Sequence, residues 1–487
     1  MPEGSRRLPE AAAKHYQPKH QIRIVTATSL FDGHDAAINI MRRLLQQGGA
    51  EVIHLGHNRS VDEVVTAAIQ EDVQAIAVSS YQGGHVEYFK YMVDLLRQRG
   101  AAHVKVFGGG GGVIVAREIR ELQDYGVERI YSPEDGQNLG LKGMIEDMIE
   151  RCDFDPLTLG MEGLPRLITA AENGKLAPAA LAEARAKAAE AQVPVLGTTG
   201  TGGAGKSSLT DELVRRFRLD DPAKKIAIIA IDPSKKKTGG ALLGDRIRMN
   251  ALGGPVFMRS LATRSSASEV PDSVPVIIDL CKAAGFELII VETPGIGQGD
   301  SAVSEIADLA MYVMTPEFGA ASQLEKIDML DHADLVAINK FDRKGGLDAL
   351  RDVRKQMQRN REAFGVDAAT MPVFGSVASR FNDDGVTALY HGLLEALAAK
   401  GFKTGESRLP KSKERFSSAS TAVVPAARVR YLAEIAESVR SYLARSDAQA
   451  ELAREVQQLA EAARLLKQAG KSGEDAEALS ASRAEHL

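Results

Sequence analysis

The stretch that decides the fold is Gly200-Thr201-Gly202-Gly203-Ala204-Gly205-Lys206-Ser207. It follows a short apolar run at residues 193–196 and precedes a helical pattern at residues 208–216. A glycine-rich turn in this position lets successive backbone N–H groups converge on phosphate oxygens, while the lysine adds a charge and the serine hydroxyl reaches Mg²⁺. The stretch therefore predicts a phosphate-binding loop in an α/β domain. A chance glycine-rich turn is the alternative.

Apolar runs alternate with helical patterns on both sides of this loop, which is typical of doubly wound parallel sheets. The strands expected around the loop are residues 193–196, 225–231, 287–291, 310–314, 334–338 and 371–374. Those expected before it are residues 22–27, 51–55, 74–79, 103–107 and 128–131. We therefore predict two α/β domains, a flavodoxin-like domain over residues 21–152 and a P-loop domain over residues 193–400.

The remaining segments differ in composition. Residues 153–192 are rich in Ala and Leu with prolines as breakers, which predicts a helical linker. Residues 1–20 predict a disordered tail, and the polar residues 401–425 predict a linker. Over residues 426–487, apolar residues recur at three- and four-residue steps, which predicts a helical arm ending in a disordered tail. Because the polar face of the arm is not notably basic, we expect its apolar stripe to pack against another element rather than a membrane.

The charge balance argues against several classes of protein. The 487 residues include 60 Lys and Arg against 65 Asp and Glu, a net charge of −5, which does not favour binding to nucleic acid or to a membrane surface. The basic run Lys235 to Lys237 is either an anion site or a solvated run. Cys152 and Cys281 offer neither a disulfide framework nor a metal-ligand spacing. With no signal peptide and no long apolar run, we expect a cytoplasmic protein without a membrane span.

A second motif selects the base of the nucleotide. Asn339-Lys340-Phe341-Asp342 follows the expected strand at residues 334–338. The Asp342 carboxylate can accept two hydrogen bonds, from guanine N1–H and N2–H₂, a pair that adenine does not offer. Ser376 to Ala378 either presents backbone N–H groups to guanine O6 or forms an ordinary turn. The motif predicts GTP as the ligand.

Further residues are placed to sense the third phosphate. Asp232 and Glu292 each follow an expected strand, where a Mg²⁺ shell needs a carboxylate, and Gly295 can bring its N–H to the γ-phosphate. Small GTPases usually carry aspartate at the position of Glu292, and the longer glutamate suggests contact through a water. Between them lies a segment in which we expect Asp245 near the metal and Arg248 near phosphate.

These expectations define three sets of residues. The expected Mg²⁺ ligands are Ser207, Asp232, Asp245, Glu292 and Thr293. The expected catalytic residues are Lys206, Glu292 and Gly295. The expected nucleotide contacts are Gly200, Gly203, Ala204, Gly205, Lys206, Ser207, Ser208, Arg248, Asn339, Lys340 and Asp342.

The first domain has a histidine at the ligand-binding edge of its sheet. Asp32-Gly33-His34-Asp35 follows the strand expected at residues 22–27. An imidazole there can bind a metal through one nitrogen while the other donates to Asp32. Small residues after the third and fourth strands, residues 79–84 and 108–112, would open a slot at the same edge. Five consecutive glycines at 108–112 are alternatively a flexible linker.

The Asp-x-His pattern resembles that of cobalamin-binding domains, in which histidine ligates cobalt from below the corrin ring. The family pattern has glycine three residues after the histidine, where this chain has Ala37. The resemblance implies that His34 is the cobalt ligand. The residues it implies as cofactor contacts are Asp32, His34, Ser79, Gly83, Gly109 and Gly110.

The second domain resembles the G-protein chaperones of adenosylcobalamin mutases over roughly residues 160–400. The motifs behind the resemblance are Asp232-Pro-Ser, Thr238-Gly-Gly, Leu243-Gly-Asp-Arg-Ile-Arg-Met249 and Glu292-Thr-Pro-Gly295. It implies slow GTP hydrolysis that gates cofactor loading and release on a partner mutase.

The order of the two domains resembles the fused isobutyryl-CoA mutases, over about residues 21–470. In that family both domains precede a substrate barrel, and the whole protein rearranges isobutyryl-CoA to n-butyryl-CoA. A barrel needs about 250 residues, and nothing after Lys400 offers strands. We therefore expect this chain to be an N-terminal part of such an enzyme, or to receive its barrel from another chain. By itself it should bind the corrinoid and hydrolyse GTP without isomerising the thioester.

The resemblance implies adenosylcobalamin, GTP and Mg²⁺ as cofactors. It implies the substrate barrel as a partner in cis or in trans, a homodimer, and an adenosyltransferase as a further partner. Two other classes stay open. One is a non-catalytic, cobalamin-responsive GTPase switch that regulates a separate partner. The other is an ATP-using transport kinase, against which the guanine-reading carboxylate of Asp342 argues.

Overall fold

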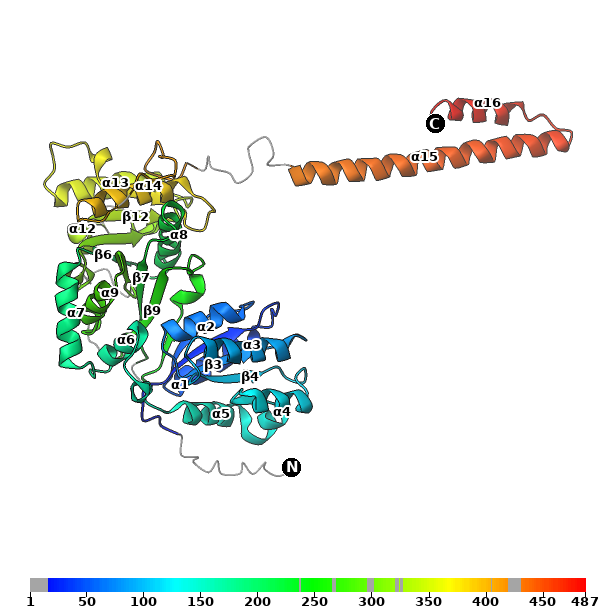
Figure 1. Ribbon diagram of the computed structural model, residues 1–487. Helices are drawn as coiled ribbons and strands as arrows, with labels where there is room; N and C mark the ends of the chain where they lie inside the picture. Colours follow the sequence, from blue (N-terminus) through cyan, green and yellow to red (C-terminus); the bar gives the residue numbers. More distant parts are fainter. Residues whose placement is uncertain are drawn as a thin grey trace, which may run out of the picture. The chain divides into compact units, whose positions relative to one another are not determined.

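The computed structural model describes residues 16–235, 238–264, 269–295, 302–319, 324, 327–403, 405–418 and 431–487. The chain divides into two compact units, Met1–Ser420 and Thr421–Leu487. The first unit contains two parallel sheets, of six and seven strands, which confirms the predicted fold class (Figure 1). None of the helices in the described ranges is both long and apolar enough to span a membrane.

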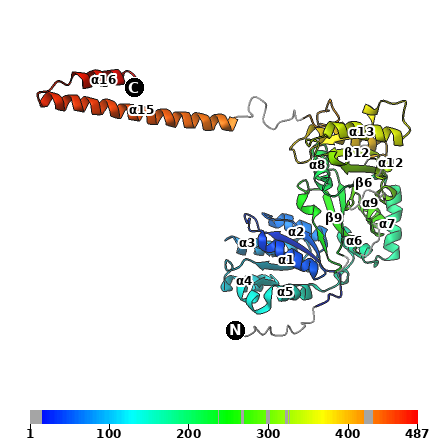
Figure 2. The same ribbon diagram turned by 180° about the vertical axis from the view of Figure 1, so that it is seen from behind.

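The first sheet has the strand order β5-β4-β3-β1-β2-β8, and its first five strands follow the flavodoxin-like order. The strands are β1 (Arg23–Thr28), β2 (Glu51–His54), β3 (Ala75–Ser79), β4 (Lys105–Gly109), β5 (Arg129–Tyr131) and β8 (Ala241–Leu243). One face packs on α2 (Val61–Gln70), α3 (His85–Gln98) and α4 (Ala116–Tyr125). The other packs on α1 (Ala36–Gln47) and α5 (Pro133–Cys152), as the two opposite views show (Figures 1 and 2).

The second sheet has the order β13-β12-β11-β6-β10-β7-β9. Its strands are β6 (Val195–Gly200), β7 (Ile226–Asp232), β9 (Val256–Ala262), β10 (Leu288–Glu292), β11 (Leu309–Met314), β12 (Leu335–Asn339) and β13 (Val373–Ser376). Helices α8 (Lys206–Asp220) and α14 (Asp384–Ala398) cover one face. The other face is covered by α6 (Leu164–Glu172), α7 (Pro178–Glu190), α9 (Val274–Ala283), α10 (Ala302–Ile306), α12 (Met329–His332) and α13 (Gly346–Asn360). The 3₁₀ turns in the described part of the chain are η1 (Pro156–Leu159), η2 (Asp245–Arg248), η3 (Pro316–Phe318) and η4 (Ala368–Thr370).

Strand β11 is apolar along its whole length because both of its faces are buried. In β11, Leu309, Met311 and Val313 pack towards α8 and α14. The alternate residues of β11, Ala310 and Tyr312 among them, pack towards α13. This two-sided burial explains why a continuous apolar run identified this strand in the sequence.

Two strands were not predicted. Strand β9 forms the edge of the second sheet beside β7. Strand β8 lies in the segment that follows β7, but it pairs in parallel with β2 of the first sheet, Glu51 opposite Ala241 and Ile53 opposite Leu243. The six-stranded sheet is therefore completed by a segment from the second domain.

Two segments of the first unit differ from the prediction: part of the expected N-terminal tail (residues 1–20) and part of the expected linker (residues 401–425). Tyr16 and His20 bind Asp153, with Tyr16 Oη donating over 2.7 Å, so residues 16–20 are held in place, while residues 1–15 lie outside the described residues. Phe402 is buried in the core, and Phe416 forms a β-bridge with Gly375 beside β13. Residues 402–403 and 405–418 thus pack on the second domain rather than forming a free linker from residue 401.

The second unit is a helical hairpin. Helix α15 (Tyr431–Gln468) is followed by α16 (Glu474–Ala484), and Ser480 donates to the carbonyl of Val456 while Lys467 pairs with Glu477. These pairings run in opposite directions along the two helices, so α16 folds back antiparallel on α15. The predicted arm is helical, and its end is a second helix rather than a disordered tail.

A cluster of buried charges joins the first domain, the helical linker and the second domain. Arg23, with only 3% of its side chain exposed, binds Glu51 at 2.6 Å and Glu71 at 2.7 Å. Arg246 binds the same Glu71 at 3.1 Å, and Arg264 binds Glu51 at 2.8 Å. Burial opposes the charge of Arg23, but the surrounding carboxylates raise its pKa. Buried charges are tolerated only when paired in this way.

Replacing Arg23 by Met should lower the free energy of unfolding by about 3–5 kcal/mol, because Glu51 and Glu71 would lose a buried partner. Urea denaturation followed by circular dichroism measures the change. The matched control is Lys187→Met, which removes an exposed i,i+4 pair with Glu183 and should leave the free energy of unfolding nearly unchanged. Equal losses in the two variants would contradict the assigned role of the cluster.

Candidate functional site

The glycine-rich loop runs from the end of β6 to the first residue of α8. Gly200 has φ 148°, and a Cβ there would lie 1.9 Å from the carbonyl oxygen of Val313. Gly205 is left-handed, with φ 92°, directly before the helix. Lys206 is buried and its Nζ donates to the Gly200 carbonyl at 3.2 Å, folding back across the loop. Burial lowers the pKa of Lys206. The loop thus presents a helix N-terminus and a lysine to one point, as phosphate binding requires.

Gly295 lies against this loop. It has φ 70°, and a Cβ there would lie 2.2 Å from Lys206 Nζ and 2.3 Å from the Gly200 carbonyl oxygen. Only glycine fits this contact. The segment after β10 is therefore in position to contact whatever the loop binds.

A hydroxyl and two carboxylates meet beside the loop. Ser207 Oγ lies 2.9 Å from Asp245 Oδ1 and 2.7 Å from Glu292 Oε1. Burial and the facing Asp245 carboxylate raise the pKa of Glu292 to about 8, and the same two causes raise the pKa of Asp232 to about 7. Crowded carboxylates of this kind favour a divalent cation.

The set suits Mg²⁺ bound together with phosphate. Within the described ranges, no three His, Cys, Asp or Glu side chains are close enough to enclose a metal ion on their own. Mg²⁺ in nucleotide sites is held by only one or two protein groups plus phosphate oxygens and waters. The residues present therefore fit a nucleotide-bound Mg²⁺ better than a closed protein cage.

The structure does not bring every expected magnesium residue to this point. The Thr293 hydroxyl is engaged elsewhere, because it donates to Thr199 Oγ1 at 2.8 Å. Asp232 lies close enough to Asp245 for that carboxylate to raise its pKa, and it accepts from the backbone N–H of Gly244 at 2.9 Å. The side chain of Arg248 is 62% exposed, 4.0 Å from Asp245. Lys236 and Lys237 lie outside the described residues.

Sequence reasoning missed Thr210. Its hydroxyl donates to Glu292 Oε2 at 3.1 Å. It follows Ser207 by three positions on α8, so both hydroxyls lie on one face of the helix. That spacing is the signal that could have found it.

The motif Asn339 to Asp342 contacts the glycine-rich loop. Asn339 is buried; its Nδ2 donates to the Ala204 carbonyl at 2.8 Å, and its Oδ1 accepts from the N–H of Ala378 at 3.0 Å. Lys340 Nζ donates to the Gly203 carbonyl at 2.7 Å. Asn339 thereby joins the phosphate loop to the turn at Ser376 to Ala378. Asp342 is exposed beside it, and Ser208 is half-buried in the first turn of α8.

The first domain holds its histidine through Asp32. The Asp32 Oδ1 atom lies 2.7 Å from His34 Nδ1 and accepts from the His34 N–H at 2.9 Å, while Oδ2 accepts from the N–H of Tyr81. Burial works against ionisation, but these hydrogen bonds lower the pKa of Asp32. The His34 side chain is 76% exposed. The pair fixes Nδ1 as the protonated nitrogen and leaves Nε2 for a metal.

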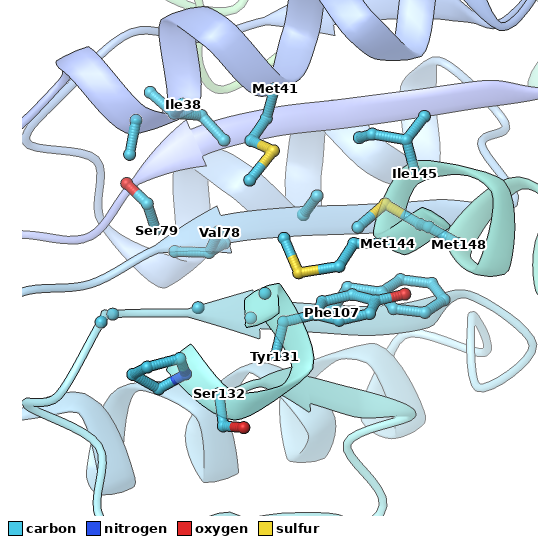
Figure 3. A pocket seen from close by; sticks show the side chains of 18 of the residues that line it. Ile38, Met41, Val78, Ser79, Phe107, Tyr131, Ser132, Met144, Ile145 and Met148 are labelled. Atoms are coloured by element: carbon cyan, nitrogen blue, oxygen red, sulfur yellow. The ribbon is translucent and has the colours of Figure 1, made fainter. Parts of the chain in front are cut away.

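An apolar cavity of about 240 Å³ opens beside this pair. The labelled side chains of Ile38, Met41, Phe107, Met144 and Met148 gather around one space between α1, α5 and the sheet (Figure 3). Ser79, Gly109, Gly110 and Ala37 also line it. Its apolar lining suits an apolar or aromatic group.

Two details of this cavity differ from the sequence expectation. Gly83 is exposed, with nothing within 4 Å of a Cβ placed there, and it is not part of the lining. The methionines of α5 were missed because no motif marks them; only the amphipathic pattern of residues 144–149 points to a buried face. Gly110 is required for packing, since a Cβ there would lie 2.0 Å from the Ser80 carbonyl oxygen.

Known proteins share both parts of the chain. Residues 164–415 match the family described as methylmalonyl Co-A mutase-associated GTPase MeaB, and residues 22–133 match the B12 binding domain. The chain is 63% identical over 479 residues to the fused isobutyryl-CoA mutase of Cupriavidus metallidurans, covering 96% of this chain and 44% of that protein.

Two further fused isobutyryl-CoA mutases are similar. That of Nocardia farcinica is 60% identical, covering 91% of this chain and 42% of that protein. That of Geobacillus kaustophilus is 55% identical, covering 97% and 45%. The chain spans less than half the length of these curated relatives. It belongs to the MeaB family of methylmalonyl-CoA mutase-associated GTPases, with a B12-binding domain in front of the GTPase domain.

Proposed function

We propose that this chain is the adenosylcobalamin-binding and GTP-hydrolysing chaperone portion of a fused isobutyryl-CoA mutase. The observation that supports this most directly is that one compact unit contains both sites: the Asp32–His34 pair with its apolar cavity, and the phosphate loop with its carboxylates. In this proposal GTP hydrolysis gates loading and release of the cofactor.

For GTP hydrolysis, Lys206 and the N-terminus of α8 hold the phosphates and offset the charge that develops on them. Ser207, Asp245 and Glu292 would hold Mg²⁺, directly or through water. The backbone N–H of Gly295 would contact the γ-phosphate, since Gly295 lies against both Lys206 and Gly200. Water attacks the γ-phosphorus, and the bond to the β-phosphate oxygen breaks to give GDP and phosphate.

For cofactor binding, His34 would ligate cobalt through Nε2, with the ionised Asp32 holding the proton on Nδ1. The apolar cavity would take the displaced benzimidazole tail, between the methionines of α5 and the glycines after β4. When bound, adenosylcobalamin supplies a cobalt–carbon bond that breaks to give radicals.

The rearrangement of isobutyryl-CoA to n-butyryl-CoA would need a substrate barrel, in cis in a longer protein or in trans. The names of the three relatives and their greater length support this part of the proposal. A homodimer and an adenosyltransferase that delivers the cofactor complete the proposed set of partners.

Changing Asp342 to Asn should weaken GTP binding about 10-fold or more, because the amide keeps one acceptor oxygen but places an NH₂ donor against a guanine donor, so one hydrogen bond to a charged group is lost at about 1.5–3 kcal/mol. Binding of xanthosine triphosphate should increase. Competition titrations with GTP, ATP and xanthosine triphosphate measure both effects. If the unmodified chain prefers ATP, the proposed function is wrong.

Changing His34 to Ala should remove protein ligation of cobalt, seen as loss of the imidazole-ligated, base-off spectrum of bound cobalamin. The control is His57→Ala, at an exposed position of the same domain, which should leave the spectrum unchanged. An unchanged spectrum in His34→Ala would show that another group ligates the cobalt.

Changing Gly110 to Ala should weaken cobalamin binding more than about 10-fold, because Gly110 lines the cavity and the added methyl group would collide with the Ser80 carbonyl oxygen. Gly112→Ala is the matched control, since a Cβ there meets nothing within 4 Å. Isothermal titration with cobalamin measures both. Equal affinities in the two variants would rule out this cavity as the binding slot.

A further inference from the structure

Residues 238–251 touch the cobalamin-binding domain and the GTPase site in turn. The segment starts against the first domain: Thr238 Oγ1 donates to the carbonyl of Gln46 at 3.3 Å, and a Cβ on Gly240 would lie 2.1 Å from the same oxygen. Strand β8 then pairs with β2. The first half of the segment is thus part of the cobalamin-binding sheet.

The next two residues enter the magnesium site. The N–H of Gly244 donates to Asp232 Oδ2 at 2.9 Å, and Asp245 Oδ1 lies 2.9 Å from Ser207 Oγ. The carboxylate of Asp245 is 16% exposed. Its position relative to Ser207 depends on how the one-turn η2 is held.

Arg246, the next residue of η2, anchors this turn through its buried side chain. Its side chain is 4% exposed; NH1 donates to Glu71 Oε1 and to the Met258 carbonyl, both at 3.1 Å, and NH2 donates to Gln70 Oε1. Gln70 and Glu71 are the end of α2 in the cobalamin-binding domain. The guanidinium is therefore fixed by two residues of the other domain.

Glu71 is itself buried and held by several donors. Besides Arg246 it accepts from Arg23 NH2 at 2.7 Å and from the N–H and hydroxyl of Ser260 at 3.0 and 2.9 Å, and it is fully buried. Hydrogen bonds from this many donors restrict the position of the carboxylate. The acceptor of Arg246 is thus itself hydrogen-bonded on several sides.

We propose that Gln70 and Glu71, acting through Arg246, are positioning residues for the GTPase: they set the place of the Asp245 carboxylate beside Ser207, so the cobalamin-binding domain completes the Mg²⁺ site. Asp245 and Arg246 are adjacent on a single helical turn, so fixing one side chain restricts the other. This inference rests on the proposed function.

The test is the Mg²⁺ dependence of guanine nucleotide binding to the full chain. In Arg246→Lys the bidentate fork is lost but the charge stays. The measured quantity is the Mg²⁺ concentration that gives half-maximal binding of a fluorescent, non-hydrolysable GTP analogue. It should rise about tenfold, because losing a residue that orients a metal ligand typically lowers metal affinity by about 10- to 100-fold. Affinity in EDTA should stay unchanged.

The matched control is Arg264→Lys. This arginine crosses the same boundary, binding Glu51 at 2.8 Å and the Glu172 carbonyl at 3.0 Å, but its side chain does not adjoin Asp245. A merely structural role predicts equal changes in the two variants, whereas the proposal predicts a magnesium shift in Arg246→Lys alone.

Gln70→Ala serves if Arg246→Lys does not fold, because it removes only one acceptor of Arg246 and should shift the Mg²⁺ requirement in the same direction. Equal shifts in Arg246→Lys and Arg264→Lys, or no shift in Arg246→Lys or Gln70→Ala, would overturn the inference while leaving the proposed GTPase intact. Absence of Mg²⁺-dependent guanine nucleotide binding in the unmodified chain would instead overturn the proposed function and this inference together.

Discussion

The relative placement of the two domains in the first unit depends on the ion pairs of the buried Glu71 carboxylate. This carboxylate lies at the end of α2 and accepts from Arg23 of its own domain and from Arg246 and Ser260 of the other. Ionised groups removed from water are stable only when their partners are complete. Separating the two domains would expose this charge cluster without its partners, so the cluster favours one relative placement of the two sheets. Strand β8 reinforces it with backbone hydrogen bonds to β2.

Both candidate sites lie where parallel sheets place ligands, at the carboxyl ends of their strands. In each, backbone packing requires glycine at the point of closest approach: Gly110 against the Ser80 carbonyl, and Gly295 against Lys206 and Gly200. Side chains then supply the chemistry. A buried carboxylate orients an exposed imidazole in the first domain, and two carboxylates and a hydroxyl converge beside the phosphate loop in the second.

A GTPase domain of the MeaB family and a B12-binding domain share this chain. The two domains therefore do not have to find each other by diffusion. The two domains are also in direct contact, in addition to being covalently linked. The segment after β7 pairs with the cobalamin-binding sheet through β8 and, two residues later, places Asp245 beside Ser207. One continuous segment of chain therefore contacts both the first sheet and the phosphate loop.

The sequence by itself determined the parts built from neighbouring residues: the phosphate loop, the Asn339–Asp342 motif, the Asp32–His34 pair, and most strands, because two-sided burial leaves a continuous apolar run. Only the tertiary structure decided what joins them. Arg246 and Glu71 are 175 positions apart, β8 leaves one domain for the other's sheet, and the methionines of α5 enclose a cavity that no motif marks. Local patterns reflect backbone geometry and periodic burial, whereas the pairing of a distant arginine with a particular glutamate depends on how the folded surfaces meet.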